Sequence, residues 1–242
     1  PFSEDDHPDP VDAYGASKWA AEKALTDPLL SRLFGYHILQ IGCNEEFSLV
    51  TESPVGHKVI FAPSWRPGSA NPVADNEELP LATDSIDVVV LHHALDFTED
   101  SHRLLREATR VLRPGGQLLI VGFNPISFWG FWKLFKRKTN LPWSARFISR
   151  RRLTDWLQLL DLHLDSTQLC LHFLPFKLRS ILKHASQFER FASKLGSPLG
   201  GVYVMLCVKQ VAPITPIVPR WRPLRTRTVV MPAAEKARVK IH

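Results

Sequence analysis

The chain has 242 residues, 45% hydrophobic and 22% charged, which is the balance of a globular protein with one substantial domain and extensions. It contains no uncharged apolar run of about 18 residues and no basic segment leading into an apolar stretch, which predicts a cytoplasmic protein without membrane span or signal peptide. Three distant cysteines, Cys43, Cys170 and Cys207, indicate a reducing compartment and no metal site, and the net charge of +6 weakly favours anionic partners.

The first predicted element is a helix over residues 13–34, interrupted near Pro28. It contains Tyr14 and Lys18, which the i,i+4 spacing places on one face. Residues 1–24 resemble the Tyr-x-x-x-Lys region of extended short-chain dehydrogenases and sugar-nucleotide epimerases. A dehydrogenase needs a Gly-rich nucleotide-binding unit before this helix, and thirteen residues are too few for one. We therefore expect the helix to pack on a sheet or lie near a cofactor mouth, either as a native element or as the remnant of a fused gene start.

Apolar runs bounded by turns predict the strands that follow, which are YHILQIG, HKVIFAPS and IDVVVLHHAL. Asp100 is the predicted N-cap of an amphipathic helix that Pro114-Gly115-Gly116 ends, and QLLIVGF is the next strand. A strand, helix and strand with short connections form a βαβ unit. The pattern predicts an α/β fold with a doubly wound, mostly parallel sheet and helices on both faces.

Three further segments complete the chain. Residues 128–138, SFWGFWKLFKRK in context, are aromatic and then basic. They cover the sheet as a helix, line an apolar substrate pocket, or contact a membrane surface peripherally. SRRRLTDWLQLLDLH predicts an amphipathic helix whose arginines are solvated; the alternative, nucleic-acid contact, has no accompanying motif. GGVYVMLCVKQ predicts a final strand. The expected organisation is an N-terminal extension and helix over residues 1–34, a domain over 35–210, and a disordered, basic, Pro-rich tail over 211–242.

The longest block of linked motifs is ELPLATDSIDVVVLHHALDFTEDSHRLLREATRVLRPGGQLLIVGFNP. With its LPL, the Asp87 that opens a strand, and RVLRPGG, it resembles the type 11 methyltransferase domain of class I S-adenosylmethionine-dependent methyltransferases over residues 38–122. GFNPISFWG and RLFGYH resemble a little-studied proteobacterial branch of that superfamily. The resemblance implies a Rossmann-like fold with an antiparallel last strand. It also implies S-adenosylmethionine as cofactor and methyl transfer to a small or lipid-like acceptor.

The resemblance also implies where the cofactor binds, at the carboxyl ends of the first strands. Gln40 stands where the family has an acid, and its amide oxygen is a candidate acceptor for the cofactor ammonium group. Asp75 matches the adenine-contacting acid. The predicted cofactor-binding residues are Gln40, Gly42, Cys43, Asn44, Glu45, Asp75 and Asn76. The second strand ends in Ala62, Pro63 and Ser64, with no carboxylate for the ribose.

His92 and His93 end a predicted strand on the substrate side and are the candidate general bases. The alternative is that one histidine is packed and the other caps the strand end. The degenerate first loop also leaves open a pseudo-methyltransferase that binds a partner with weak or no cofactor binding. The sequence predicts neither the identity of the methyl acceptor nor the oligomeric state.

Overall fold

The computed structural model describes residues 10–42, 48–61, 72–75, 77–133, 144–171 and 199–210, all of which belong to one compact unit, Pro1–Val211. The predicted tail over 211–242 lies outside the described residues. The helices are α1 (Pro10–Leu30), the 3₁₀ turn η1 (Val50–Glu52), α2 (Ala94–Phe97), α3 (Ser101–Val111), α4 (Phe128–Lys133) and α5 (Arg150–Leu159). The strands are β1 (His37–Gly42), β2 (His57–Phe61), β3 (Ile86–His92), β4 (Leu112–Phe123), β5 (Leu162–Cys170) and β6 (Val202–Lys209).

The strands form one sheet in the order β2-β1-β3-β4-β6-β5. β2, β1, β3 and β4 are parallel, whereas β6 runs antiparallel to both β4 and β5. The predicted fold class, mostly parallel with an antiparallel last strand, is confirmed. Because the chain leaves β1 for β2 and then returns to place β3 on the other side of β1, the strand order reverses between β1 and β3. Ligands of doubly wound sheets bind at such a point, beyond the carboxyl ends of the strands.

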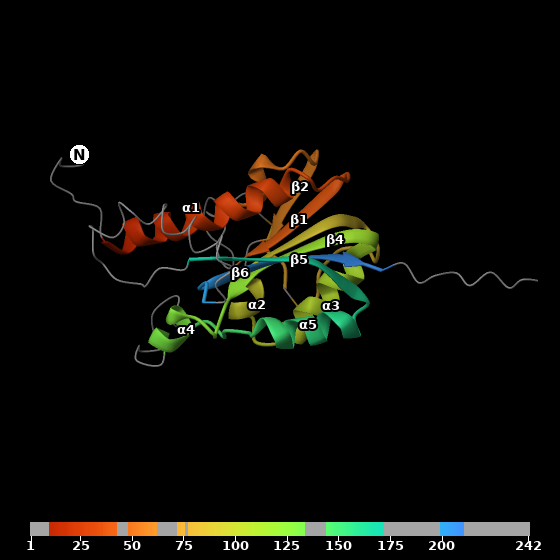
Figure 1. Ribbon diagram of the computed structural model, residues 1–242. Helices are drawn as coiled ribbons and strands as arrows, with labels where there is room; N and C mark the ends of the chain where they lie inside the picture. Colours follow the sequence, from red (N-terminus) through yellow and green to blue (C-terminus); the bar gives the residue numbers. More distant parts are fainter. Residues whose placement is uncertain are drawn as a thin grey trace, which may run out of the picture. The chain divides into compact units, whose positions relative to one another are not determined.

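Helices cover both faces of the sheet (Figure 1). On one face, the end of α1 and the η1 region pack on β1, β3 and β4, with Leu30 and Leu49 among the fully buried side chains. On the other face, α3 packs on β4 and α5 packs on β5, and Leu104 and Leu157 are buried there. The central strands are buried on both sides, which explains their continuous apolar runs.

The predicted elements differ from the observed ones mainly at their boundaries. Asp100 is the N-cap of α3, since its side chain accepts from the amides of His102 and Arg103. The helix ends at Val111, before the predicted stop, and the Pro-Gly-Gly segment lies in the irregular first part of β4, where the register with β3 shifts. β5 was not predicted as a strand, because only its ends are buried and its alternating pattern follows a helix without a Gly or Pro between them.

The connection from β1 to β2 holds only η1 as regular structure among its described residues. In the part of the chain that is described, no helix is long and apolar enough to cross a membrane. The predicted cover helix is α4, a short element with Trp129 buried and Phe131 exposed. Peripheral membrane contact through residues 128–138 stays a prediction, and residues 134–143 of that segment are not described.

Asp87 joins the start of β1 to the start of β3. Its Oδ2 accepts from the amides of Tyr36 (2.8 Å) and His37 (2.9 Å), and its Oδ1 accepts from Arg113 (3.0 Å). A Cβ on Gly35 would lie 2.4 Å from Asp87 Cβ, so only glycine permits this approach. Burial raises the pKa of Asp87, but the His37 and Tyr36 amides and Arg113 outweigh it and hold the pKa below its usual value.

We predict that Asp87→Ala lowers the free energy of unfolding by about 3 kcal/mol at pH 7, because hydrogen bonds to a charged acceptor are lost. The lowered pKa means that this stability is present above the pKa of an unfolded aspartate and is lost as the pH falls through the folded-state value. Guanidinium unfolding at pH 7 and pH 3 measures both effects. Asp155→Ala, which removes an exposed acid from α5, is the control, and equal losses in the two variants would contradict the assignment.

Candidate functional site

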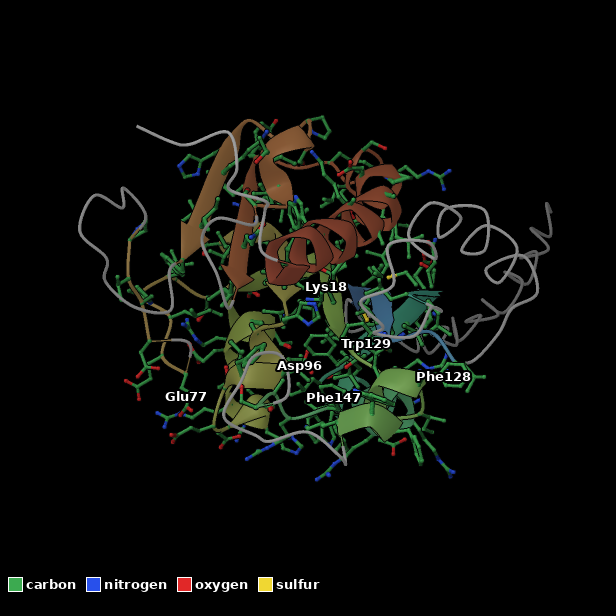
Figure 2. All side chains as sticks on the ribbon, turned by 90° about the vertical axis from the view of Figure 1, so that its left-hand side faces the viewer. Lys18, Glu77, Asp96, Phe128, Trp129 and Phe147 are labelled. Atoms are coloured by element: carbon green, nitrogen blue, oxygen red, sulfur yellow. The ribbon has the colours of Figure 1, made fainter. Side chains whose placement is uncertain are left out.

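The carboxyl ends of β1 and β3 meet at the point where the strand order reverses. Gly42 pairs with His92 in the register of the two strands and forms an isolated bridge with His93. Figure 2 looks onto this edge of the sheet, with Lys18, Asp96 and Phe147 near its centre. The predicted catalytic histidines and the predicted cofactor glycine are therefore neighbours.

Gln40 does not face this edge as predicted. It is fully buried, and its Oε1 accepts from the amides of Leu49 (2.8 Å) and Val50 (3.3 Å). Both lone pairs of the amide oxygen are thus used to hold η1 against β1. In this arrangement Gln40 supports the β1–β2 connection, and its predicted contact with a cofactor ammonium group stays a prediction.

Of the other predicted cofactor residues, Cys43, Asn44, Glu45 and Asn76 lie outside the described residues. Asp75 is exposed, and its Oδ1 accepts from the amide of Glu77 (2.9 Å). Glu77 in turn accepts from the amide of Asp100 (3.3 Å), at the start of α3. Since α3 starts just beyond the carboxyl end of β3, Asp75 stands at the same edge as Gly42.

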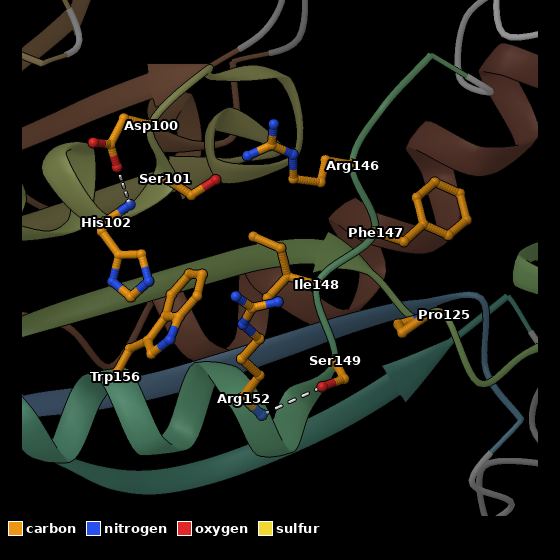
Figure 3. Close-up of a pocket in the computed structure, with 10 residues that line it drawn as sticks. All are labelled: Asp100, Ser101, His102, Pro125, Arg146, Phe147, Ile148, Ser149, Arg152 and Trp156. Atoms are coloured by element: carbon orange, nitrogen blue, oxygen red, sulfur yellow. Dashed lines mark hydrogen bonds between the residues drawn. The ribbon is translucent and has the colours of Figure 1, made fainter.

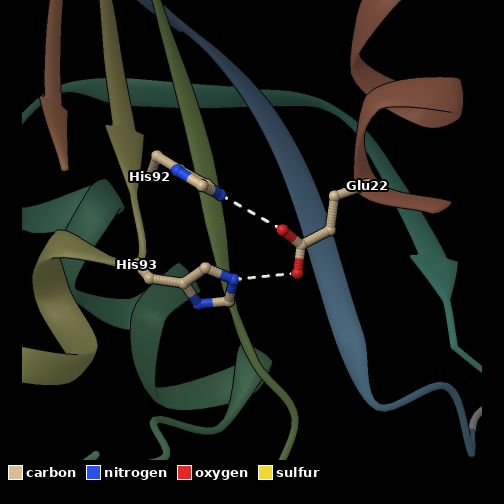
Figure 4. A group of neighbouring side chains, drawn as sticks. All are labelled: Glu22, His92 and His93. Atoms are coloured by element: carbon tan, nitrogen blue, oxygen red, sulfur yellow. Dashed lines mark hydrogen bonds and ion pairs between the residues drawn. The ribbon is translucent and has the colours of Figure 1, made fainter. Parts of the chain in front are cut away.

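A buried carboxylate on α1 contacts both histidines. Glu22 Oε2 lies 3.1 Å from His92 Nε2, and Glu22 Oε1 lies 3.0 Å from His93 Nε2 (Figure 4). Lys18, one turn earlier on α1, places its Nζ 3.1 Å from Glu22 Oε1 and 3.2 Å from His93 Nε2. We call Lys18, Glu22, His92, His93 and Asp96 the edge cluster.

Asp96 holds the other side of His93. Its Oδ2 lies 2.9 Å from His93 Nδ1 and also accepts from the amide of Phe123, at the end of β4 (3.1 Å). Each ring nitrogen of His93 thus faces the oxygen of a carboxyl group, Nε2 that of Glu22 and Nδ1 that of Asp96. His93 adopts φ 53° at the N-cap of α2, a left-handed conformation that is uncommon outside glycine.

Burial is the largest single influence on the pKa values of His92, Glu22 and Asp96. Burial lowers the pKa of His92 to about 4, so this imidazole is neutral at pH 7. Burial alone would raise the pKa of Glu22, but the charges of Lys18 and His93 and the histidine hydrogen bonds hold it well below its usual value. For Asp96 burial prevails and raises the pKa, although His93 opposes it.

Both histidines are inaccessible in this arrangement, with His92 3% and His93 1% exposed. The Nε2 of His92 faces Glu22, and both nitrogens of His93 face carboxylates. A general base must reach the proton that it abstracts. Their role as general bases stays a prediction that requires α1 to move, and the packed arrangement agrees with the alternative interpretation of the pair.

Glu22, His92 and His93 offer ligand atoms that lie within 4.8 Å of one another, which is a spacing that a metal ion could bridge. The same atoms already hydrogen-bond each other, and the ammonium group of Lys18 occupies the anionic side of Glu22. We therefore assign no metal to the cluster.

Aromatic rings lead from the edge cluster to the surface. His93 stacks on Phe123 with centroids 4.2 Å apart, and Phe123 stacks on Phe147 at 4.9 Å. Phe147 borders two hollows. One, of about 400 Å³, lies between the starts of α3 and α5 and is bordered by Ser101, Arg152 and Trp156 (Figure 3). The other, of about 900 Å³, lies beside α4.

Comparison with known proteins agrees with the fold. The family model described as "Methyltransferase domain" matches residues 62–120. The uncharacterized protein YafS of Escherichia coli is 35% identical over 213 residues, which cover 84% of this chain and 83% of that protein. The chain belongs to the class I S-adenosylmethionine-dependent methyltransferase family. Neither match supports the resemblance of residues 1–24 to dehydrogenases.

One further relative and one solved structure are similar to this chain. A probable S-adenosylmethionine-dependent methyltransferase of Mycolicibacterium smegmatis is 29% identical over 150 residues, 57% of this chain and 56% of that protein. The structure of an S-adenosylmethionine-dependent methyltransferase of Thermotoga maritima shares the fold with a TM-score of 0.60 and 19% identity, over 83% of this chain and 96% of that one.

Glu22, Asp96 and Phe147 are not among the site residues predicted from the sequence, and Lys18 is considered there only for a dehydrogenase. Glu22 and Lys18 share the i,i+4 spacing that drew attention to Tyr14 and Lys18, and an acid and a base paired in this way on the face that also carries Leu29 are a usable signal. Asp96 follows the strand end by four residues, within reach of the predicted edge.

We predict that the protein loses stability between pH 6.5 and 4 through His92. Unfolded, His92 binds a proton below about pH 6.5, whereas folded it does so only near pH 4. The contribution is complete above pH 6.5 and is lost as the pH falls, by roughly 3 kcal/mol for a shift of this size. His92→Gln keeps a donor for Glu22 but does not titrate, so its unfolding free energy should change less between pH 7 and pH 4.5 than that of the wild type.

The matched control is His163→Gln, which removes an exposed imidazole on β5. It should follow the wild-type pH dependence. If the unfolding free energy of His92→Gln falls with pH as steeply as that of His163→Gln, the assignment of this pH dependence to His92 is wrong.

Proposed function

We propose that the protein transfers a methyl group from S-adenosylmethionine to a small or lipid-like acceptor at the carboxyl edge of β1, β3 and β4. The observation that carries the proposal is the convergence of Gly42, Asp75 and an open hollow at one edge of a methyltransferase-family sheet. The hollow belongs to this edge because the segment from Pro125 directly follows the end of β4.

The described residues fit the cofactor at two points. Gly42, at the switch point, gives the backbone room to approach the amino-acid moiety. Asp75 presents an exposed carboxylate that suits the adenine amino group. Gln40 does not fit, because its oxygen is already used. The cofactor supplies an electrophilic methyl group when bound, and the chain's own residues must orient the acceptor toward it.

This edge of the sheet can contribute to the reaction by orienting the acceptor. The edge cluster ties α1, β3 and α2 together through buried charges, so the rim of the site is held in one geometry. Fixed positioning of a nucleophile can account for a large part of a rate enhancement without proton abstraction. Lys18, 20% exposed, is the one member of the cluster with an appreciable exposed surface, and it can meet an anionic acceptor there.

The second candidate is a binding module of the same fold without catalysis. Gln40 favours it, since the residue at the position of the usual acid now supports η1 instead of a ligand. The two candidates differ in whether cofactor binds, so one measurement separates them.

We predict that the full chain binds S-adenosylhomocysteine in isothermal titration calorimetry. Asp75→Ala should weaken binding roughly tenfold to a hundredfold, the effect of one or more hydrogen bonds to a charged group. Glu78→Ala is the control, because it removes an exposed acid of the same loop that pairs with Arg103. Absence of binding at millimolar ligand by a folded protein would reject methyl transfer in favour of the binding module.

A further inference from the structure

The hollow beside α4 combines exposed apolar side chains with two cations, and we call it the α4 groove. Ile126 is 67% exposed and Phe131 is 61% exposed, which is unusual for neighbouring large apolar residues. Lys133 and Arg146 border the same groove, and no acidic residue is among its described lining residues. The charge and the apolar surface together fit an amphiphilic anion.

The turn that forms the floor of the groove is fixed by buried polar contacts. The side-chain amide of Asn124, 1% exposed, donates to Ile126 O (3.0 Å) and to Gly200 O (2.9 Å). Ser127 Oγ donates to Asn124 O (2.6 Å) and accepts from the amide of Gly130 (3.1 Å).

The turn is also tight, because a Cβ on Gly130 would lie 1.9 Å from the oxygen of Pro125. The motif GFNPISFWG thus encodes a rigid platform between β4 and α4, so the groove is formed before a ligand arrives.

One of the two cations contacts the ring of Phe147, and the other, Arg146, precedes Phe147 in the chain. Lys133 Nζ lies 4.2 Å from the centroid of Phe147 and donates to the oxygen of Ala145. Arg146 is exposed and donates through one nitrogen to Glu99 O (3.0 Å). A guanidinium group carries five N–H donors in a planar fork, which suits a carboxylate or phosphate.

The ring also connects the groove to the edge cluster. Phe147 stacks on Phe123, and Phe123 stacks on His93. A ligand whose anionic group meets Arg146 can therefore lay its apolar part along Phe147 toward the carboxyl edge. Figure 2 shows Phe147 near the centre of that edge and Phe128 to one side.

We propose that the α4 groove binds a small anionic amphiphile, a molecule with one carboxylate or phosphate group on an apolar ring system or chain, and that this molecule is the methyl acceptor. The role as acceptor rests on the proposed function, whereas the binding does not. A membrane surface fits less well, because α4 has only six residues and Trp129 on it is buried, whereas interfacial helices present a long apolar face.

The test uses two fluorescent probes that differ in one charged group. 1-Anilinonaphthalene-8-sulfonate is an anionic amphiphile, and N-phenyl-1-naphthylamine has the same rings without the sulfonate. The wild-type chain should bind the sulfonate more tightly. Arg146→Gln should weaken the sulfonate about tenfold, as expected for one charged hydrogen bond, and leave the neutral probe unchanged. Phe131→Ala should weaken both.

Arg152→Gln is the matched control, because it removes the same charge from an exposed residue that borders the other hollow. It should leave both probes unchanged, and thermal melting establishes that each variant is folded. Equal effects of Arg146→Gln and Arg152→Gln, or an equal loss of both probes in Arg146→Gln, would overturn the proposal. A second assay measures sedimentation of the protein with phosphatidylglycerol vesicles. If Phe131→Ala reduces this sedimentation but leaves sulfonate binding unchanged, the proposal is overturned in favour of a membrane surface.

The probe titrations contain no S-adenosylmethionine, so they are independent of the cofactor experiment. Groove binding without S-adenosylhomocysteine binding would reject the proposed function and retain the groove. The opposite result would retain the methyltransferase and reject the groove ligand.

Discussion

The geometry of the candidate site depends on the buried carboxylate of Glu22. A charge that is 1% exposed is costly unless its partners compensate for lost solvation, and removing one partner of such a set leaves the others buried and unpaired. Here Lys18 and His93 share one oxygen and His92 takes the other. The set of partners fixes where α1 crosses the edge of the sheet, and α1 in turn closes the histidines off from solvent.

Asp96 extends this constraint to the groove. Its side chain binds His93 and the amide of Phe123, while its backbone oxygen accepts from the amide of Arg146 (2.6 Å). One residue of α2 thus holds the histidine of the edge cluster, the end of β4, and the segment that carries Arg146 and Phe147. A shift of α2 would move the edge cluster and the α4 groove together. The two regions are far apart in the sequence, but α2 connects them in space.

The fold was more predictable from the sequence than the site. Continuous apolar runs and the cap at Asp100 are local signals, so the parallel strands, α3 and the fold class could be predicted. The edge cluster is not local: Glu22 meets histidines about seventy positions away. Gln40 shows the same limit, since a polar residue within a strand is equally compatible with a ligand contact and with support of the next turn. The roles of Cys43, Asn44, Glu45 and Asn76 stay predictions.

The charged side chains differ between the part of the site proposed for the acceptor and the part proposed for the cofactor. The acids of the edge cluster, Glu22 and Asp96, are buried and paired, and the partly exposed member of the cluster is a cation, Lys18. The charged residues among the described lining of the α4 groove, Lys133 and Arg146, are also cations. An edge of this kind attracts an anionic acceptor, but it offers little to the positive charges of S-adenosylmethionine. Those charges must be met from elsewhere at the switch point, and the loop after Gly42 carries Glu45 and Glu46. The proposed function therefore assigns the acceptor to α1 and α4, and it assigns the cofactor to the segments after β1 and before β3.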